Sequence, residues 1–115
     1  MDPNVGDVIE LLTGIQEKNL AVGAQGAVVH CHSPLAYEVE FTNDEGETLA
    51  LVTLPPDQFI IVWRAETQQW VSAAEQAAAL VAGLPAEAGR EVVDFARFLA
   101  TRTQQNREQN VVVSA

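Results

Sequence analysis

The chain has 115 residues, the usual length of one domain, and its 48% hydrophobic and 19% charged residues predict a globular protein with a core. No window is apolar over the ~18 residues that a membrane span requires, and the N-terminus has no basic segment followed by an apolar one. We therefore expect no membrane association, no signal peptide and a cytoplasmic location. Cys31 is the only cysteine, which excludes an internal disulfide.

The charge is the most informative feature of the composition. The net charge is −10 with six Lys and Arg residues, whereas phosphate binding needs clusters of these residues, so nucleic acid is not an expected partner. Residues 1–64 hold ten acidic residues against two cations, a net −8, and residues 65–115 hold six against four, a net −2. Two interpretations stay open for the acidic N-terminal half, which are solubility and a surface that binds a basic partner.

Five segments of the N-terminal half have the apolar alternation or β-rich composition of short strands and are separated by turn residues. They are residues 5–12, 27–32, 37–42, 48–54 and 58–63. In the clearest of them, Tyr37, Val39 and Phe41 share one face and Glu38 and Glu40 the other. Because closure removes exposed sheet edges, five short strands at this spacing predict a small barrel in residues 1–64.

Residues 65–115 predict a helical tail, because alanines replace β-branched residues and the apolar period shifts toward 3.6. Ser72 and Glu75 form a capping box for a helix over about residues 72–82. Gly83 suits the stop of that helix, and Pro85 suits the first turn of a second helix that should end near residue 104. For the terminal Val111-Val112-Val113, fraying and strand addition to a neighbour both stay open.

The second predicted helix carries one apolar stripe that needs a partner. Ala88, Val92, Phe95, Ala96 and Leu99 recur at helical spacing, and Phe98 lies beside them. The stripe either packs on the barrel or binds another chain, by homodimerisation or with a cognate partner.

Several short segments resemble a known family. They are Gly6-Asp7-Val8, the run from Gly23 to Val29, the run from Tyr37 to Phe41, the run from Ala50 to Leu54, and Leu54-Pro55-Pro56-Asp57-Gln58. Over about residues 4–62 the chain resembles the bacterial domain-of-unknown-function family 4926, which is common in cyanobacteria. The resemblance implies that the five predicted strands form an SH3-like β-barrel related in shape to KOW domains. With the predicted C-terminal helical hairpin after it, the expected fold class is α+β. It implies no catalytic residue.

A second resemblance covers about residues 76–102. Leu84-Pro85-Ala86-Glu87, the run from Glu91 to Phe95, and Phe98-Leu99 are similar to the helical segment of small antitoxin-like proteins. Genes of the first family often lie beside toxin-like or nuclease-like genes. The resemblance therefore implies that this chain is the small partner protein of such a neighbour. Together the two resemblances imply a protein that binds a toxin or nuclease.

Residue types that could support a metal site or catalysis are few. His30 and His32 share a strand face while Cys31 points the other way, so at most two of the three could meet one ion, and we expect no metal site, exposed histidines and a buried Cys31. Glu38 and Glu40 lack the burial that separates the pKa values of an acid and a base. We expect no cofactor and no enzymatic activity.

Trp63 and Trp70 flank the junction between the predicted barrel and the helices. We expect them to be core residues that join the two parts, with an exposed aromatic contact site as the alternative.

These patterns favour a protein-protein interaction module, in its most specific form an antitoxin- or immunity-like partner of a basic toxin or nuclease. The expected partner-binding residues are Glu38, Glu40, Asp44, Glu45, Glu47, Val92, Phe95, Phe98 and Leu99. Two alternatives remain: a KOW-like module that binds nucleic acid or the ribosome, which the charge disfavours, and a small structural subunit of a larger assembly.

Overall fold

The computed structural model describes residues 2–114, with side chains described through residue 108. The chain divides into two compact units, Met1–Ala79 and Leu80–Ala115. The strands are β1 (Val8–Leu11), β2 (Gln25–Ser33), β3 (Ala36–Thr42), β4 (Thr48–Leu54), β5 (Phe59–Arg64) and β6 (Gln69–Trp70). The short 3-10 helices are η1 (Gln16–Lys18) and η2 (Pro56–Gln58), and the α-helices are α1 (Ala73–Ala82) and α2 (Ala86–Ser114).

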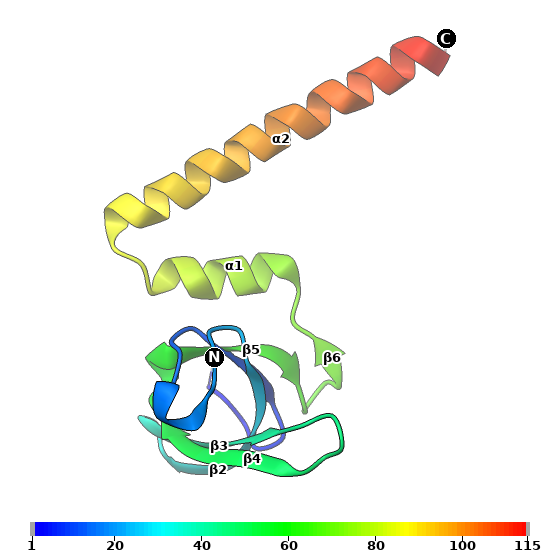
Figure 1. The fold of residues 1–115 in the computed structure, drawn as a ribbon. Coiled ribbons are helices and arrows are strands. Elements are labelled where there is room, and N and C mark those ends of the chain that lie inside the picture. Colours follow the sequence, from blue (N-terminus) through cyan, green and yellow to red (C-terminus); the bar gives the residue numbers. More distant parts are fainter. Residues whose placement is uncertain (1, 115) are drawn as a thin grey trace. The chain divides into compact units, whose positions relative to one another are not determined.

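The strands form one curved antiparallel sheet in the order β4-β3-β2-β1-β5-β6 (Figure 1). The α+β class is confirmed, but the prediction of a closed five-stranded barrel is wrong. A sixth strand, Gln69–Trp70, pairs with Trp63 and Arg64 of β5. Because β4 and β6 lie at the two ends of the strand order, the sheet is open and has two edges.

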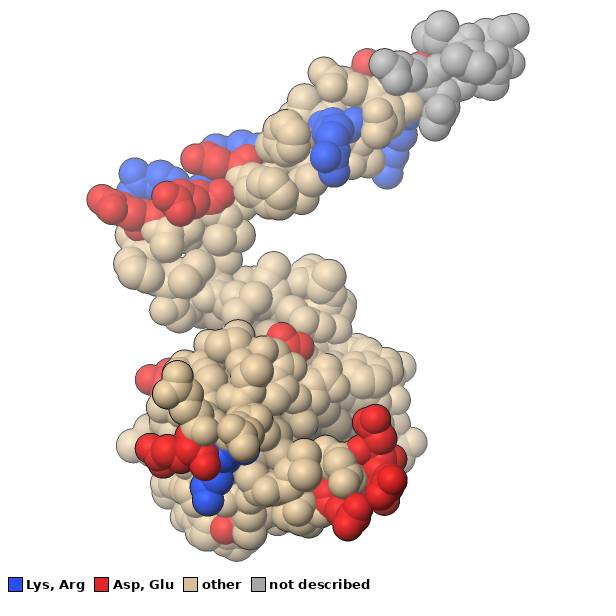
Figure 2. Space-filling view, viewed as in Figure 1, with Lys and Arg blue, Asp and Glu red and all other residues tan. Residues whose placement is uncertain are grey.

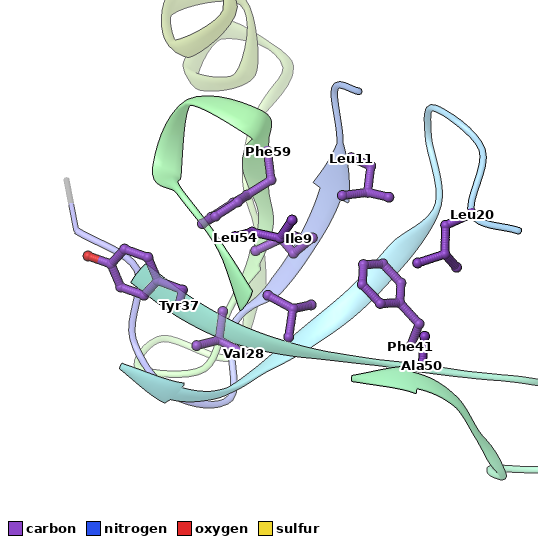
Figure 3. Packing of buried hydrophobic residues seen from close by; sticks show 10 residues of the cluster. Ile9, Leu11, Leu20, Val28, Tyr37, Phe41, Ala50, Leu54 and Phe59 are labelled. Carbon is purple, nitrogen blue, oxygen red and sulfur yellow. The ribbon is translucent and has the colours of Figure 1, made fainter. Parts of the chain in front are cut away.

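The core of the first unit lies on the concave side of this sheet. Tyr37, Val39 and Phe41 of β3 are buried, as the alternation predicts, while the residues between them are half-buried on the opposite face. The cluster consists of Ile9, Leu11, Leu20, Val28, Tyr37, Val39, Phe41, Ala50, Leu54 and Phe59 (Figure 3). Its members come from β1 to β5 and the loop after η1, so the core joins segments far apart in the sequence.

Tyr37 makes the core sensitive to alkaline pH. Its ring lies edge-on to Phe59, with centroids 6.0 Å apart, and burial raises the pKa of its hydroxyl above the ordinary value of 10.0, with a smaller contribution from the neighbouring Cys31 thiol. A raised pKa in the folded state means that the neutral tyrosine stabilises the fold below pH 10. This stabilisation is lost as the pH rises through the folded-state pKa.

We therefore expect Tyr37→Phe to be more resistant to alkali than the wild type. The free energy of unfolding of the wild type should fall as the pH rises above the ordinary tyrosine pKa of 10.0, and that of the variant should fall less. Urea titrations at several pH values, followed by tryptophan fluorescence, measure this difference. Equal slopes for both proteins would contradict a titrating Tyr37.

Helix α1 begins where the capping box predicts. The Glu75 amide donates to the Ser72 hydroxyl at 3.2 Å, and the Arg64 guanidinium joins β5 to this first turn through Glu75, also at 3.2 Å. The expected range of about 72–82 agrees with Ala73–Ala82.

Helix α2 is longer than predicted. It continues to Ser114 instead of ending near residue 104, and Val111–Val113 belong to its backbone, so they form no added strand. The physical reason is that no Gly or Pro follows Gly89, while Gln, Arg and Glu in residues 104–109 are good helix formers.

Candidate functional site

The turn between β3 and β4 presents three acidic side chains on a rigid frame. Asn43 organises it, because its Oδ1 accepts hydrogen bonds from the amides of Glu45 and Glu47, both at 2.9 Å, and its Nδ2 donates to Glu47 Oε1 at 3.2 Å. Gly46 takes a φ of +82° that closes the turn, and Asp44 is exposed. The predicted residues Asp44, Glu45 and Glu47 are therefore brought together.

Glu38 and Glu40 extend this acidic surface along the convex face of β3. The Thr48 hydroxyl donates to Glu40 Oε2 at 2.6 Å, which holds that carboxylate beside the end of the turn. Glu38 lies opposite His30 of β2, and its Oε1 is 3.6 Å from His32 Nε2. We call Glu38, Glu40, Asp44, Glu45 and Glu47 the acidic surface.

The acidic surface has little compensating charge. Among the described side chains, residues 2–108, no Lys or Arg forms an ion pair with any of its five members. Arg64 instead pairs with Glu75. Figure 2 shows acidic side chains gathered at one corner of the first unit, where the hairpin of β3 and β4 lies in Figure 1. Such a field favours a cationic ligand and repels an anionic one.

Exposed leucines next to the acidic surface were missed by the sequence analysis. Leu49 is 61% and Leu51 52% exposed, both on β4, and Leu51 is the cross-strand neighbour of Glu40. Both faces of β4 carry apolar residues, so the sequence does not indicate which face is buried. Ala50, Val52 and Leu54 lie on one face, and Leu49 and Leu51 lie on the other. The edge strand β4 thus combines apolar contact area with flanking carboxylates, which is a common composition for an interface.

In the His30-Cys31-His32 segment, the exposure of the histidines agrees with the prediction and that of the cysteine does not. The two histidine rings meet edge to face, with centroids 4.4 Å apart and an interplanar angle of 70°, and both are exposed as expected. Cys31 was expected to be buried and is exposed, with its Sγ 3.5 Å from the Ser33 carbonyl. The register of β2 shifts on both sides of Cys31, which breaks the strict alternation of faces. Within the described residues, no group of three or more potential metal ligands occurs.

The two tryptophans are cross-strand neighbours on β5 and β6. Trp63 is half-buried, but Trp70 is 68% exposed, so the prediction of a core residue is wrong for Trp70.

The apolar residues predicted to bind a partner lie in the second unit, on α2. Phe95 is 62%, Phe98 56% and Val92 38% exposed, while Leu99 is partly buried. The rings of Phe95 and Phe98 stack with centroids 6.2 Å apart. The predicted partner-binding residues therefore form two groups, the acidic surface in Met1–Ala79 and an apolar helix face in Leu80–Ala115.

The comparisons with known proteins bear on the first unit. Residues 6–61 match the family model described as "Domain of unknown function (DUF4926)", which confirms the resemblance seen in the sequence. Over this segment, which covers β1 to the middle of β5, the chain is similar to that family. No curated protein and no solved structure matches the chain significantly. In the described residues, no helix is long and apolar enough to cross a membrane.

Proposed function

We propose that the protein is a non-catalytic interaction module whose acidic surface binds a basic protein. The observation that carries this proposal is the combination of exposed Leu49 and Leu51 on the edge strand β4 with carboxylates that, among the described side chains, no Lys or Arg pairs. Solubility alone explains the carboxylates but not the leucines, because exposed apolar side chains lower solubility. Carboxylates would steer a basic partner, and the leucines would supply the dehydrated contact.

In its most specific form, the partner is a basic toxin or nuclease, and this chain masks it as an antitoxin or immunity protein does. The similarity of residues 76–102 to antitoxin-like helices supports this form. The finer assignment of the curved sheet to the SH3-like folds is part of the same proposal, and the return of β5 to pair with β1 supports it.

The experiment compares two variants of the full chain with the same change of charge. Asp44→Asn/Glu45→Gln/Glu47→Gln neutralises the turn, and the control, Glu17→Gln/Asp57→Asn/Glu66→Gln, neutralises three exposed carboxylates elsewhere in the first unit. The turn variant should bind the partner about tenfold more weakly, or ~1.4 kcal/mol, since each exposed charge contributes roughly 0.5 kcal/mol. The control should bind as the wild type does.

The partner is captured from host extract on the immobilised chain, identified by mass spectrometry and titrated against each variant. We expect a basic protein that elutes as the salt concentration approaches about 1 M, where charges are screened beyond ~3 Å. Equal binding by both variants, or a complex that is stable in this salt, contradicts the charge mechanism. Recovery of RNA or DNA in place of a protein favours the KOW-like alternative.

A further inference from the structure

Helix α2 presents an aromatic face on which a cation also lies. Phe95 and Phe98 are stacked and exposed, and the Arg102 guanidinium carbon lies 5.5 Å from the centroid of the Phe98 ring. Arg97 pairs instead with Asp94, at 3.2 Å. The 29 residues of α2 span about 43 Å at ~1.5 Å per residue, and the described residues of its C-terminal part are exposed. A helix of this kind gains most of its stability from packing.

The residues of this face follow a heptad pattern. Ala88, Phe95 and Arg102 are seven residues apart, as positions a of a coiled coil are. Glu91, Phe98 and Gln105 follow at positions d, and Val92 and Leu99 lie next to them at positions e. The seam therefore has an aromatic centre, with a carboxylate toward its N-terminal end and a guanidinium toward its C-terminal end.

We propose that α2 pairs with α2 of a second copy of this chain in an antiparallel orientation. In an antiparallel pair, position a of one helix faces position d of the other. With the two-fold axis between residues 96 and 97, Phe95 meets Phe98 of the second copy. In the same register, Glu91 meets Arg102 of the second copy, and Val92 lies near its Leu99. Symmetry repeats each contact, so two aromatic layers lie between two ion-pair layers.

The positions of Glu91 and Arg102 favour a second copy of α2 in the antiparallel orientation over one in the parallel orientation. The face carries its carboxylate and its guanidinium at equal distances from the aromatic centre, so it is complementary to itself when reversed. A parallel pair would instead place Glu91 against Glu91 and Arg102 against Arg102. Like charges at the seam are unfavourable, whereas the antiparallel pair neutralises both. The aromatic layers exclude water from these ion pairs and strengthen them.

This inference concerns the second unit and does not depend on the acidic surface. The test uses charge reversal in the full chain, with the monomer-dimer equilibrium measured by sedimentation and multi-angle light scattering. The wild type should form a dimer with a dissociation constant on the order of micromolar. Glu91→Arg and Arg102→Glu should each raise this constant about tenfold or more, because each change affects two symmetric pairs.

The double variant Glu91→Arg/Arg102→Glu restores opposite charges in the antiparallel register, and its dissociation constant should return to within about threefold of the wild type. Arg97→Glu is the matched control, since it makes the same change as Arg102→Glu outside the seam and should leave the dimer unchanged. Circular dichroism verifies that each variant keeps its helix content.

Three results would overturn the proposal. They are a wild type that stays monomeric up to ~100 µM, single variants that dimerise as the wild type does, and a double variant that is no better than the single ones. The last result is the one expected of a parallel pair, because there the double variant still brings like charges together.

Discussion

Asp7→Ala is expected to lower the free energy of unfolding by about 3–5 kcal/mol, the largest effect that we expect of a single substitution. Asp7 is 1% exposed, and its carboxylate accepts two backbone hydrogen bonds. Oδ2 accepts from the Asn4 amide and Oδ1 from the Ala65 amide, both at 2.9 Å. The second bond joins the start of β1 to the end of β5 across 58 residues of sequence. Alanine leaves both donors without this acceptor and opens a space in a packed region.

Two further variants separate the hydrogen bonds from the charge. Asp7→Asn keeps one carbonyl oxygen but turns an amide group toward the second donor, so it should lose roughly half as much stability, about 2 kcal/mol. Asp57→Ala removes the same charge at an exposed position of η2 and should change stability by less than about 0.5 kcal/mol. Urea unfolding followed by tryptophan fluorescence measures all three. If Asp57→Ala and Asp7→Ala were equally destabilised, net charge and not the two bonds would explain the loss.

Local patterns in the sequence predicted the parts of the fold that local physics determines. The alternation of Tyr37, Val39 and Phe41 identified the buried face of β3, and the Ser72-Glu75 box placed the start of α1. Strand β6 could not be predicted in the same way. Its two residues have no period, and they form a strand only because Trp70 and Gln69 pair with β5. The sheet is open because β4 and β6, at the two ends of the strand order, are not neighbours.

In the candidate site too, the sequence predicted the residues that local turn chemistry places and missed those that strand pairing places. The acidic turn could be predicted because its carboxylates are adjacent in the sequence and Asn43 and Gly46 are typical turn residues. The exposure of Leu51 depends on its pairing with Glu40, and the exposure of Cys31 depends on register shifts in β2. The role of Asp7 depends on Ala65, which no spacing rule connects to it.

Gly26→Ala should destabilise the sheet by about 2–3 kcal/mol, the second largest effect we expect. Gly26 lies on β2, and the position that a side chain would occupy faces the core. A Cβ built there would lie 2.8 Å from Val39 Cγ1, 2.9 Å from Phe41 Cδ1 and 2.9 Å from the Glu40 carbonyl oxygen. The side chains could move, but the carbonyl belongs to the backbone of the neighbouring strand, so β2 and β3 must separate locally. Packing as dense as a crystal does not absorb such a shift without loss of contacts.

Gly46→Ala is the control that distinguishes this steric cause from a general sensitivity to glycine replacement. Gly46 has a φ of +82°, and no atom lies within 4 Å of the Cβ position, so alanine there costs only the strain of a left-handed backbone, about 1 kcal/mol. Urea unfolding should therefore rank Gly26→Ala as the less stable variant. A second variant, Gly26→Ala/Phe41→Leu, removes one of the three clashing atoms but not the carbonyl. Because the backbone contact remains, the added leucine should not restore wild-type stability, and full restoration would show that Phe41 alone requires the glycine.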